Sequence, residues 1–182
     1  MPSESNRVFI IEAIDAYVRK DYQTALQQWL KAANAGVTTA KYWAGYMLYW
    51  GEGSPRNYTS SFFWLRSAAE DGHREAQLYT GRLLEAGEGT SPDLVEAASW
   101  YKKAAQQDLP AAQYELGRMF QMGLGVEKSL VTAHYWALKS AQNGDELAQL
   151  MTAENFFLGR GALQNYVEAR KWASKAAEKG NT

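Results

Sequence analysis

Small and apolar residues recur three or four positions apart along most of the chain, in stretches of about thirteen residues. In residues 110–122, for example, Ala112, Leu116, Met119 and Phe120 fall on one face of an α-helix. A glycine follows each of the best-defined stretches, as is typical after a helix C-terminus. The pattern predicts first helices near 38–50, 74–86, 110–122 and 146–158, and second helices near 57–71, 93–107, 129–143 and 165–179.

The pattern repeats every 36 residues without drift. The columns in this register are Gly51, Gly87, Gly123 and Gly159; Gly53, Gly89, Gly125 and Gly161; Ala40, Ala76, Ala112 and Ala148; and Trp64, Trp100, Trp136 and Trp172. Gly36, Gly72, Gly144 and Gly180 close the units, with Asp108 as the one departure. Each unit is therefore expected to be an antiparallel pair of helices joined by a tight Gly-x-Gly loop.

The first 36 residues read as a degenerate unit. Helices are expected at about 6–19 and 21–34, with Arg19-Lys20-Asp21 replacing the longer glycine loop. Terminal units of repeat arrays commonly depart from the consensus. We therefore predict an all-α protein of five hairpins and ten helices. It forms one solenoid domain over 1–182, with a degenerate hairpin at 1–36 and full repeats at 37–72, 73–108, 109–144 and 145–180.

Single residues in the pattern have expected structural roles. Asn57, Asp93 and Asn165 stand where a helix N-cap acceptor is wanted. Gly45, Gly81 and Gly117 fall within helices, where glycine costs about 1 kcal/mol relative to alanine. That cost is acceptable where the partner helix approaches closely, so we expect tight helix contacts there, with the tryptophan column filling the space between units.

Three stretches carry a resemblance to a known family. The run from Ala112 to Val126 resembles the first half of a Sel-one-like repeat (SLR), and Ala97 to Ala105 resembles its second half. Ala16 to Trp29 is similar to the opening hairpin of many bacterial SLR proteins. The resemblance covers about residues 7–180 and implies a right-handed α-solenoid, related to tetratricopeptide repeats, that acts as an adaptor or scaffold.

The resemblance narrows the function only to a few roles. For bacterial SLR proteins, the resemblance implies roles in secretion-system assembly, envelope signalling, host interaction or immunity against toxic effectors. One branch of the family carries a cysteine pair in each repeat and has been linked to β-lactam binding. This chain has no cysteine, so that branch is not supported.

Charge and composition exclude several classes of partner. The formal net charge is −1, which provides no bulk attraction to nucleic acid or to anionic membranes. The absence of cysteine removes disulfides and thiolate metal sites. No apolar stretch approaches the roughly 20 residues of a membrane span. We expect a cytoplasmic protein without cofactor or metal, or a periplasmic one if a signal peptide has been removed.

The sequence contains no recognisable arrangement of catalytic residues. The Gly-x-Gly pairs lack the Lys-Ser/Thr of a phosphate loop and recur at helix C-termini. His73 and His134 have no ligands or catalytic partners at helical spacing, and carboxylates such as Glu85 and Glu88 are typical of a solvated helix face. The chain is therefore interpreted as a non-enzyme, with a β-lactam hydrolase as the least favoured alternative.

The repeat geometry suggests a binding surface. In the related tetratricopeptide superhelix the first helices line a concave groove, and the same columns transferred to this register give the partner-binding residues Tyr42, Tyr46, Tyr49, Trp50, Arg82, Glu85, Arg118 and Gln121. Exposed Tyr, Trp and Arg are enriched at binding hot spots. The alternative is that the aromatic residues fill space against the degenerate hairpin. Trp43 and Leu48 lie on the opposite arc of that helix.

We expect a protein or peptide partner in the groove and a role as scaffold or adaptor. The alternative is an immunity protein that binds and inhibits a toxic effector, for example of a secretion system. The polar last helix, 165–179, is expected to be a true cap. Weak self-association is expected through the first helix, where Val8 to Ile11 are four consecutive apolar residues, with Phe9 and Ile10 at its centre.

Overall fold

The computed structural model describes residues 4–180, with the side chains of 179 and 180 excepted. These residues form ten α-helices and no strand. The helices are α1 (Glu4–Val18), α2 (Tyr22–Asn34), α3 (Thr38–Trp50), α4 (Tyr58–Glu70), α5 (Arg74–Ala86), α6 (Leu94–Gln106), α7 (Pro110–Met122), α8 (Leu130–Gln142), α9 (Glu146–Leu158) and α10 (Tyr166–Gly180). The prediction of an all-α solenoid fold with five helical hairpins is confirmed.

The helix ends follow local signals in the sequence. The four predicted first helices begin and end at the expected residues, and the second helices agree within one residue at each end. The side chains of Asp21, Asn57 and Asn165 accept hydrogen bonds from backbone N–H groups of the first turns of α2, α4 and α10. The N-cap role of Asp93 stays a prediction.

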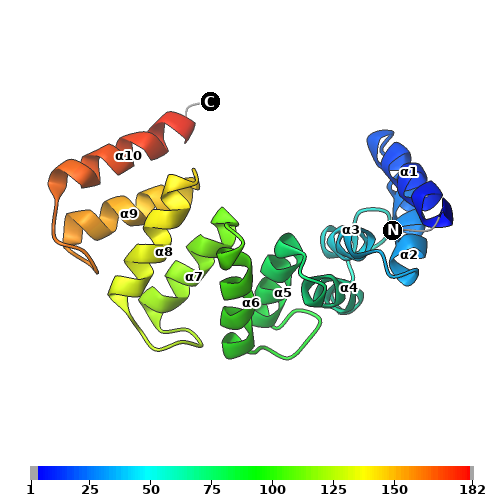
Figure 1. Cartoon of the computed structure of the whole chain (residues 1–182), viewed down its shortest axis with the longest axis horizontal. Coiled ribbons are helices and arrows are strands. Elements are labelled where there is room, and N and C mark those ends of the chain that lie inside the picture. The colour runs from blue at the N-terminus through cyan, green and yellow to red at the C-terminus, as the bar shows by residue number, and fades with distance from the viewer. Residues whose placement is uncertain (1–3, 181–182) are drawn as a thin grey trace. The chain divides into compact units, whose positions relative to one another are not determined.

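The chain divides into two compact units. The first comprises α1 to α5 and the second α6 to α10, with the division between Asp93 and Leu94. Within each unit, each helix packs against the next one along the chain, as the ribbon of Figure 1 shows. The prediction of one domain over 1–182, with its repeat boundaries, stays a prediction.

Two different requirements explain the Gly-x-Gly loops. The first glycine ends the helix in the left-handed conformation: Gly51 has φ 77° and its N–H donates to the carbonyl of Met47. The second glycine passes over the start of the preceding second helix. A Cβ on Gly53 (φ 80°) would lie 2.2 Å from the carbonyl oxygen of Tyr22, the first residue of α2. A side chain at Gly53 would therefore collide with backbone, which explains the second glycine.

Mid-helix glycines mark close helix contacts, as expected. A Cβ on Gly45 would lie 2.7 Å from Cγ of Leu65, and the Ser61 hydroxyl donates to the Gly45 carbonyl at 2.8 Å. A Cβ on Gly117 would lie 3.2 Å from the Ala133 carbonyl oxygen. These contacts join the two helices of a hairpin. Of the tryptophan column, Trp100 and Trp172 are buried and Trp64 and Trp136 half-buried.

The unit without a closing glycine keeps the same backbone conformation. Asp108 has φ 57°, in the left-handed region that Gly36 and Gly72 also occupy. Aspartate tolerates this region better than most residues. Its carboxylate lies 2.7 Å from the Lys139 ammonium. The departure in sequence is therefore not a departure in fold.

Candidate functional site

The structure divides the predicted binding residues between the two units. Six belong to the first unit, on α3 (Tyr42, Tyr46, Tyr49, Trp50) and α5 (Arg82, Glu85), and two belong to α7 in the second (Arg118, Gln121). A single groove that joins all eight stays a prediction. The six residues of the first unit are the ones for which the structure supplies a packed surface.

That surface is built around one helix. Tyr42, Tyr46 and Trp50 are spaced by four residues along α3 and form one ridge, in which consecutive ring centroids are 5.8 Å and 6.3 Å apart. Tyr49 lies beside Trp50 at 5.1 Å. The ring of Tyr79, from α5, contacts three of them, with centroids 6.5 Å from Tyr42, 5.5 Å from Tyr46 and 5.3 Å from Tyr49. We call these five residues the aromatic face.

Tyr79 was not among the residues predicted from the sequence. It stands 36 residues after Trp43 and so shares the column that the repeat register assigns to the opposite arc. At the first step of the array, Trp43 turns toward the N-terminal hairpin, 5.8 Å from Tyr17 and 6.1 Å from Trp29. The alternative that aromatic residues fill space against the degenerate hairpin therefore applies to Trp43. Its counterpart Tyr79 packs against the ridge instead.

The phenols of Tyr42, Tyr46 and Tyr49 remain protonated at neutral pH. Burial is the largest cause that raises the pKa of Tyr42 and of Tyr46, and the neighbouring Tyr79 is the second largest. Glu52 raises the pKa of Tyr46 further. Burial and the Glu88 carboxylate raise the pKa of Tyr49. Neutral phenols both donate and accept hydrogen bonds. These three tyrosines thus offer hydroxyl groups without becoming charged.

Charged and neutral polar groups lie around the aromatic face. The Tyr17 hydroxyl donates to Glu52 Oε2 at 3.2 Å. The Arg82 guanidinium lies 5.5 Å from the Tyr79 ring centroid, in a cation–π contact. His73 stacks on Tyr42 at 4.4 Å, and burial lowers its pKa, so it is neutral at pH 7. Such groups suit the recognition of a polar and aromatic surface.

Two negative findings apply to the described residues. No group of three or more His, Cys, Asp or Glu side chains is placed to hold a metal ion. No helix in the described part of the chain is long and apolar enough to cross a membrane.

In the second unit, Arg118 pairs with Glu115 at 3.0 Å and Gln121 borders a surface hollow beside Met122. These two residues make no aromatic cluster like that of α3.

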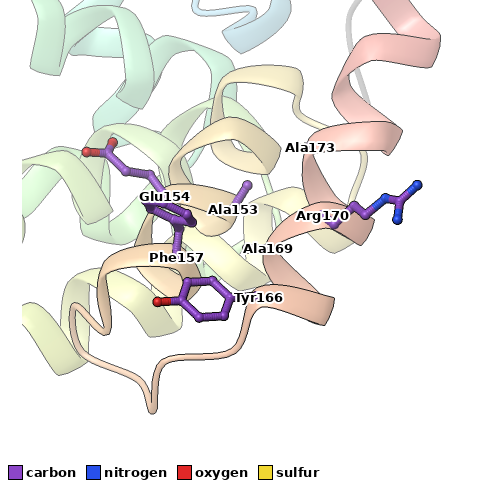
Figure 2. Close-up of a pocket in the computed structure, with 7 residues that line it drawn as sticks. All are labelled: Ala153, Glu154, Phe157, Tyr166, Ala169, Arg170 and Ala173. Carbon is purple, nitrogen blue, oxygen red and sulfur yellow. The ribbon is translucent and has the colours of Figure 1, made fainter.

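A second hollow lies at the C-terminal end, between α9 and α10. It has a volume of about 390 Å³ and is lined by Ala153, Glu154, Phe157, Tyr166, Ala169, Arg170 and Ala173. Figure 2 shows the Phe157 and Tyr166 rings side by side, with Glu154 and Arg170 extending to opposite sides. One repeat earlier, Met151 of α9 packs in the same cluster as Ala133 and Ala137, the counterparts of Ala169 and Ala173. One repeat earlier, α9 therefore fills the position that corresponds to this hollow.

The first helix, α1, and the last helix, α10, differ from the predictions in which of their side chains are exposed. Phe9 and Ile10 pack against the core of the first hairpin, whereas Val8 and Ile11 are exposed. The four consecutive apolar residues thus divide between two faces of α1. On α10, Arg170, Lys171 and Lys175 are exposed, as a polar cap requires, but Ala173 is exposed too. The Lys179 side chain lies outside the described residues.

Comparison with known proteins identifies the repeats. Sel1 repeats match at residues 15–37, 38–73, 74–109, 110–145 and 147–181. No curated protein sequence matches the chain.

Solved structures agree with this assignment. The chain is similar to c5321, a protective antigen present in uropathogenic Escherichia coli strains displaying an SLR fold, with 34% identity and a TM-score of 0.91 over 97% of the chain. It spans only 38% of the length of c5321. A Sel1 repeat protein from Oxalobacter formigenes is 29% identical with a TM-score of 0.84, over 93% of this chain and 70% of that one.

A more distant structure shows likeness of fold alone. It is a Sel1 repeat protein from Klebsiella pneumoniae subsp. pneumoniae, 20% identical with a TM-score of 0.61, over 96% of this chain and 87% of that one. Sel1 repeat proteins generally mediate protein–protein interaction. Because Sel1 repeats match five times between residues 15 and 181, the chain belongs to the Sel1 repeat (SLR) family.

Proposed function

We propose that the protein is a non-enzymatic scaffold or adaptor that binds a partner protein or peptide through the aromatic face of its first unit. The observation that supports this is the partly exposed cluster of Tyr42, Tyr46, Tyr49, Trp50 and Tyr79. Trp50 remains 47% exposed although it touches two tyrosines. Large aromatic side chains held rigid by their neighbours lose little entropy on binding.

The charges at the border support a partner with both polar and apolar groups. Arg82 and Glu85 follow Tyr79 along α5, and Glu52 and Glu88 belong to the loops after α3 and α5. An interface with an apolar centre and a charged rim is the usual anatomy of a specific protein contact. Arg118 and Gln121 on α7 stay predicted binding residues of the second unit. We place the binding event in the cytoplasm, or in the periplasm if the protein is exported.

The experiment requires a partner first and variants second. The full chain, immobilised, is used to capture proteins from a native bacterial lysate, and the captured partner is purified. Its affinity for the chain is then measured by isothermal titration calorimetry. Replacing Tyr49 and Trp50 together by alanine should weaken binding at least about 30-fold, since a single hot-spot residue already contributes about 2 kcal/mol or more.

A matched control is available on the same unit. Phe63 on α4 is a 63% exposed aromatic residue outside the aromatic face, so Phe63→Ala should leave the affinity unchanged. Equal binding by the Tyr49/Trp50 variant and the wild type would move the site elsewhere. The purified partner also separates the two roles: a toxic effector bound by an immunity protein loses its activity in the complex, whereas a scaffolded component keeps it.

A further inference from the structure

An apolar pocket of about 260 Å³ opens between α1, α2 and α3, next to the aromatic face. It is lined by Ile10, Ile14, Tyr17, Val18, Trp29, Thr39 and Trp43. We propose that this pocket receives one bulky apolar side chain of the bound partner segment, and that Glu52 at its edge pairs with a lysine or arginine next to that side chain. This inference rests on the proposed function and specifies the chemistry of its partner.

The pocket arises from the degenerate first hairpin. When α1 and α3 are aligned at their last residues, Val18 and Trp50, Ile14 takes the place of Tyr46 and Ile10 that of Tyr42. At the next step along the array, the Tyr79 ring packs against this ridge of tyrosines. At the first step the smaller isoleucines face Trp43, which is drawn toward Tyr17 and Trp29. The space that aromatic rings fill at the later step therefore remains open here.

One wall of the pocket is formed by Trp29, whose side chain is only 3% exposed. Its Nε1 atom is buried away from solvent, so the indole contributes apolar ring surface to the pocket. Binding pockets usually combine an apolar lining with a few polar groups that orient the ligand. Here the polar group is Glu52, outside the apolar lining.

The mouth of the pocket combines apolar and acidic groups. Ile14 is 48% exposed and Val18 is exposed as well, so both present apolar surface to solvent at the rim. Tyr17 also lines the pocket, and its hydroxyl donates to Glu52 at 3.2 Å. Among the described residues, no basic side chain is recorded in an ion pair with Glu52. A carboxylate beside aromatic rings favours a cation. The carboxylate attracts the cation directly, and the faces of the rings attract it as well.

The size of the pocket limits its occupant. Sites for drug-sized ligands have volumes of about 300–1,000 Å³. A volume of about 260 Å³ suits a single large side chain such as leucine, phenylalanine or tryptophan. Through Trp43, whose ring lies 5.6 Å from Tyr46, the pocket is continuous with the aromatic face. A peptide anchored in the pocket would therefore run onto the aromatic face.

A random peptide library displayed on phage and selected on the full chain tests the proposal without a known partner. The selected peptides should share a bulky apolar residue with Lys or Arg one to three positions away. One synthetic peptide from the selection is then labelled, and its affinity is measured by fluorescence anisotropy. Ile14→Lys should weaken binding at least 10-fold, and Val18→Lys, at a more exposed position, should act in the same direction.

Two controls isolate the pocket and the charge. Ile11 is 59% exposed on the same helix but does not line the pocket, so Ile11→Lys should change affinity less than twofold. Glu52→Gln should weaken binding of the basic peptide about fivefold. It should leave unchanged the affinity of a control peptide that has norleucine in place of the lysine. In NMR spectra, the Trp29 Nε1–H signal, assigned with Trp29→Phe, should change its chemical shift on binding, because the bound side chain lies against the indole ring.

The outcomes separate this inference from the proposed function. If the selected peptides bind equally to wild type and Ile14→Lys but lose affinity for the Tyr49/Trp50 variant, the pocket is not the anchor site and the aromatic face still binds. If they lack the apolar and basic pair, or bind regardless of Glu52, the proposed partner chemistry is wrong. If no peptide binds the wild-type chain, both this inference and peptide binding by the aromatic face are overturned.

Discussion

The second glycine of each Gly-x-Gly loop should be more sensitive to substitution than its backbone conformation alone implies. Gly53 and Gly36 both lie in the first unit and have similar φ angles, 80° and 84°. A Cβ on Gly36 would meet nothing within 4 Å, whereas one on Gly53 would lie 2.2 Å from the Tyr22 carbonyl oxygen. Replacing each by alanine therefore separates backbone strain from collision.

The magnitudes follow from these two effects. Alanine in the left-handed region costs about 1–2 kcal/mol, so Gly36→Ala should lower the free energy of unfolding by that amount. Gly53→Ala adds the cost of overpacking, about 1–3 kcal/mol or more. The upper end applies because the obstacle is backbone at the start of α2, which cannot rotate away as a flexible side chain could. Gly53→Ala is thus expected to cost about 4–5 kcal/mol.

Urea denaturation followed by far-UV circular dichroism measures both variants. The midpoint should fall for Gly36→Ala and fall clearly further for Gly53→Ala. Hydrogen exchange gives a local readout, in which the amides at the start of α2 should lose protection in Gly53→Ala and keep it in Gly36→Ala. Equal midpoints and equal protection would refute the argument that the loop is held against α2 by backbone contact.

Three further predictions follow from the packing. Val8→Glu with Ile11→Glu should abolish any concentration-dependent increase in mass seen by light scattering, because these residues are exposed on α1; a wild type that stays monomeric at high concentration would contradict self-association. Burial and Glu52 raise the pKa of Tyr17 to about 12, so stability should fall as pH rises from about 10 to 12, and Glu52→Gln should lower that pKa in a spectrophotometric titration. Leu65→Ala should cost about 2–5 kcal/mol by urea denaturation, since Leu65 is fully buried against Gly45, and a smaller loss would mean that the helices close the cavity.

The sequence by itself determined the helices and where they end. The 36-residue register, the glycines and the N-cap residues act locally, through turn geometry and hydrogen bonds to neighbouring N–H groups. The glycines are why α3, α5, α7 and α9 end at the expected residues, and the caps Asn57 and Asn165 are why α4 and α10 begin close to theirs. The same register placed Tyr42, Tyr46, Tyr49 and Trp50 together, because residues on one face of a single helix share their surroundings.

Only the tertiary structure decided what lies against that face. Trp43 and Tyr79 occupy the same column of the repeat, yet one turns to the N-terminal hairpin and the other packs on the tyrosine ridge. Likewise, Phe9 and Ile10 are packed inward while Val8 and Ile11 are exposed. The reason is physical: a register fixes the direction of a side chain relative to its own helix. The space available to it depends on the sizes of residues on neighbouring helices, which the degenerate first hairpin changes.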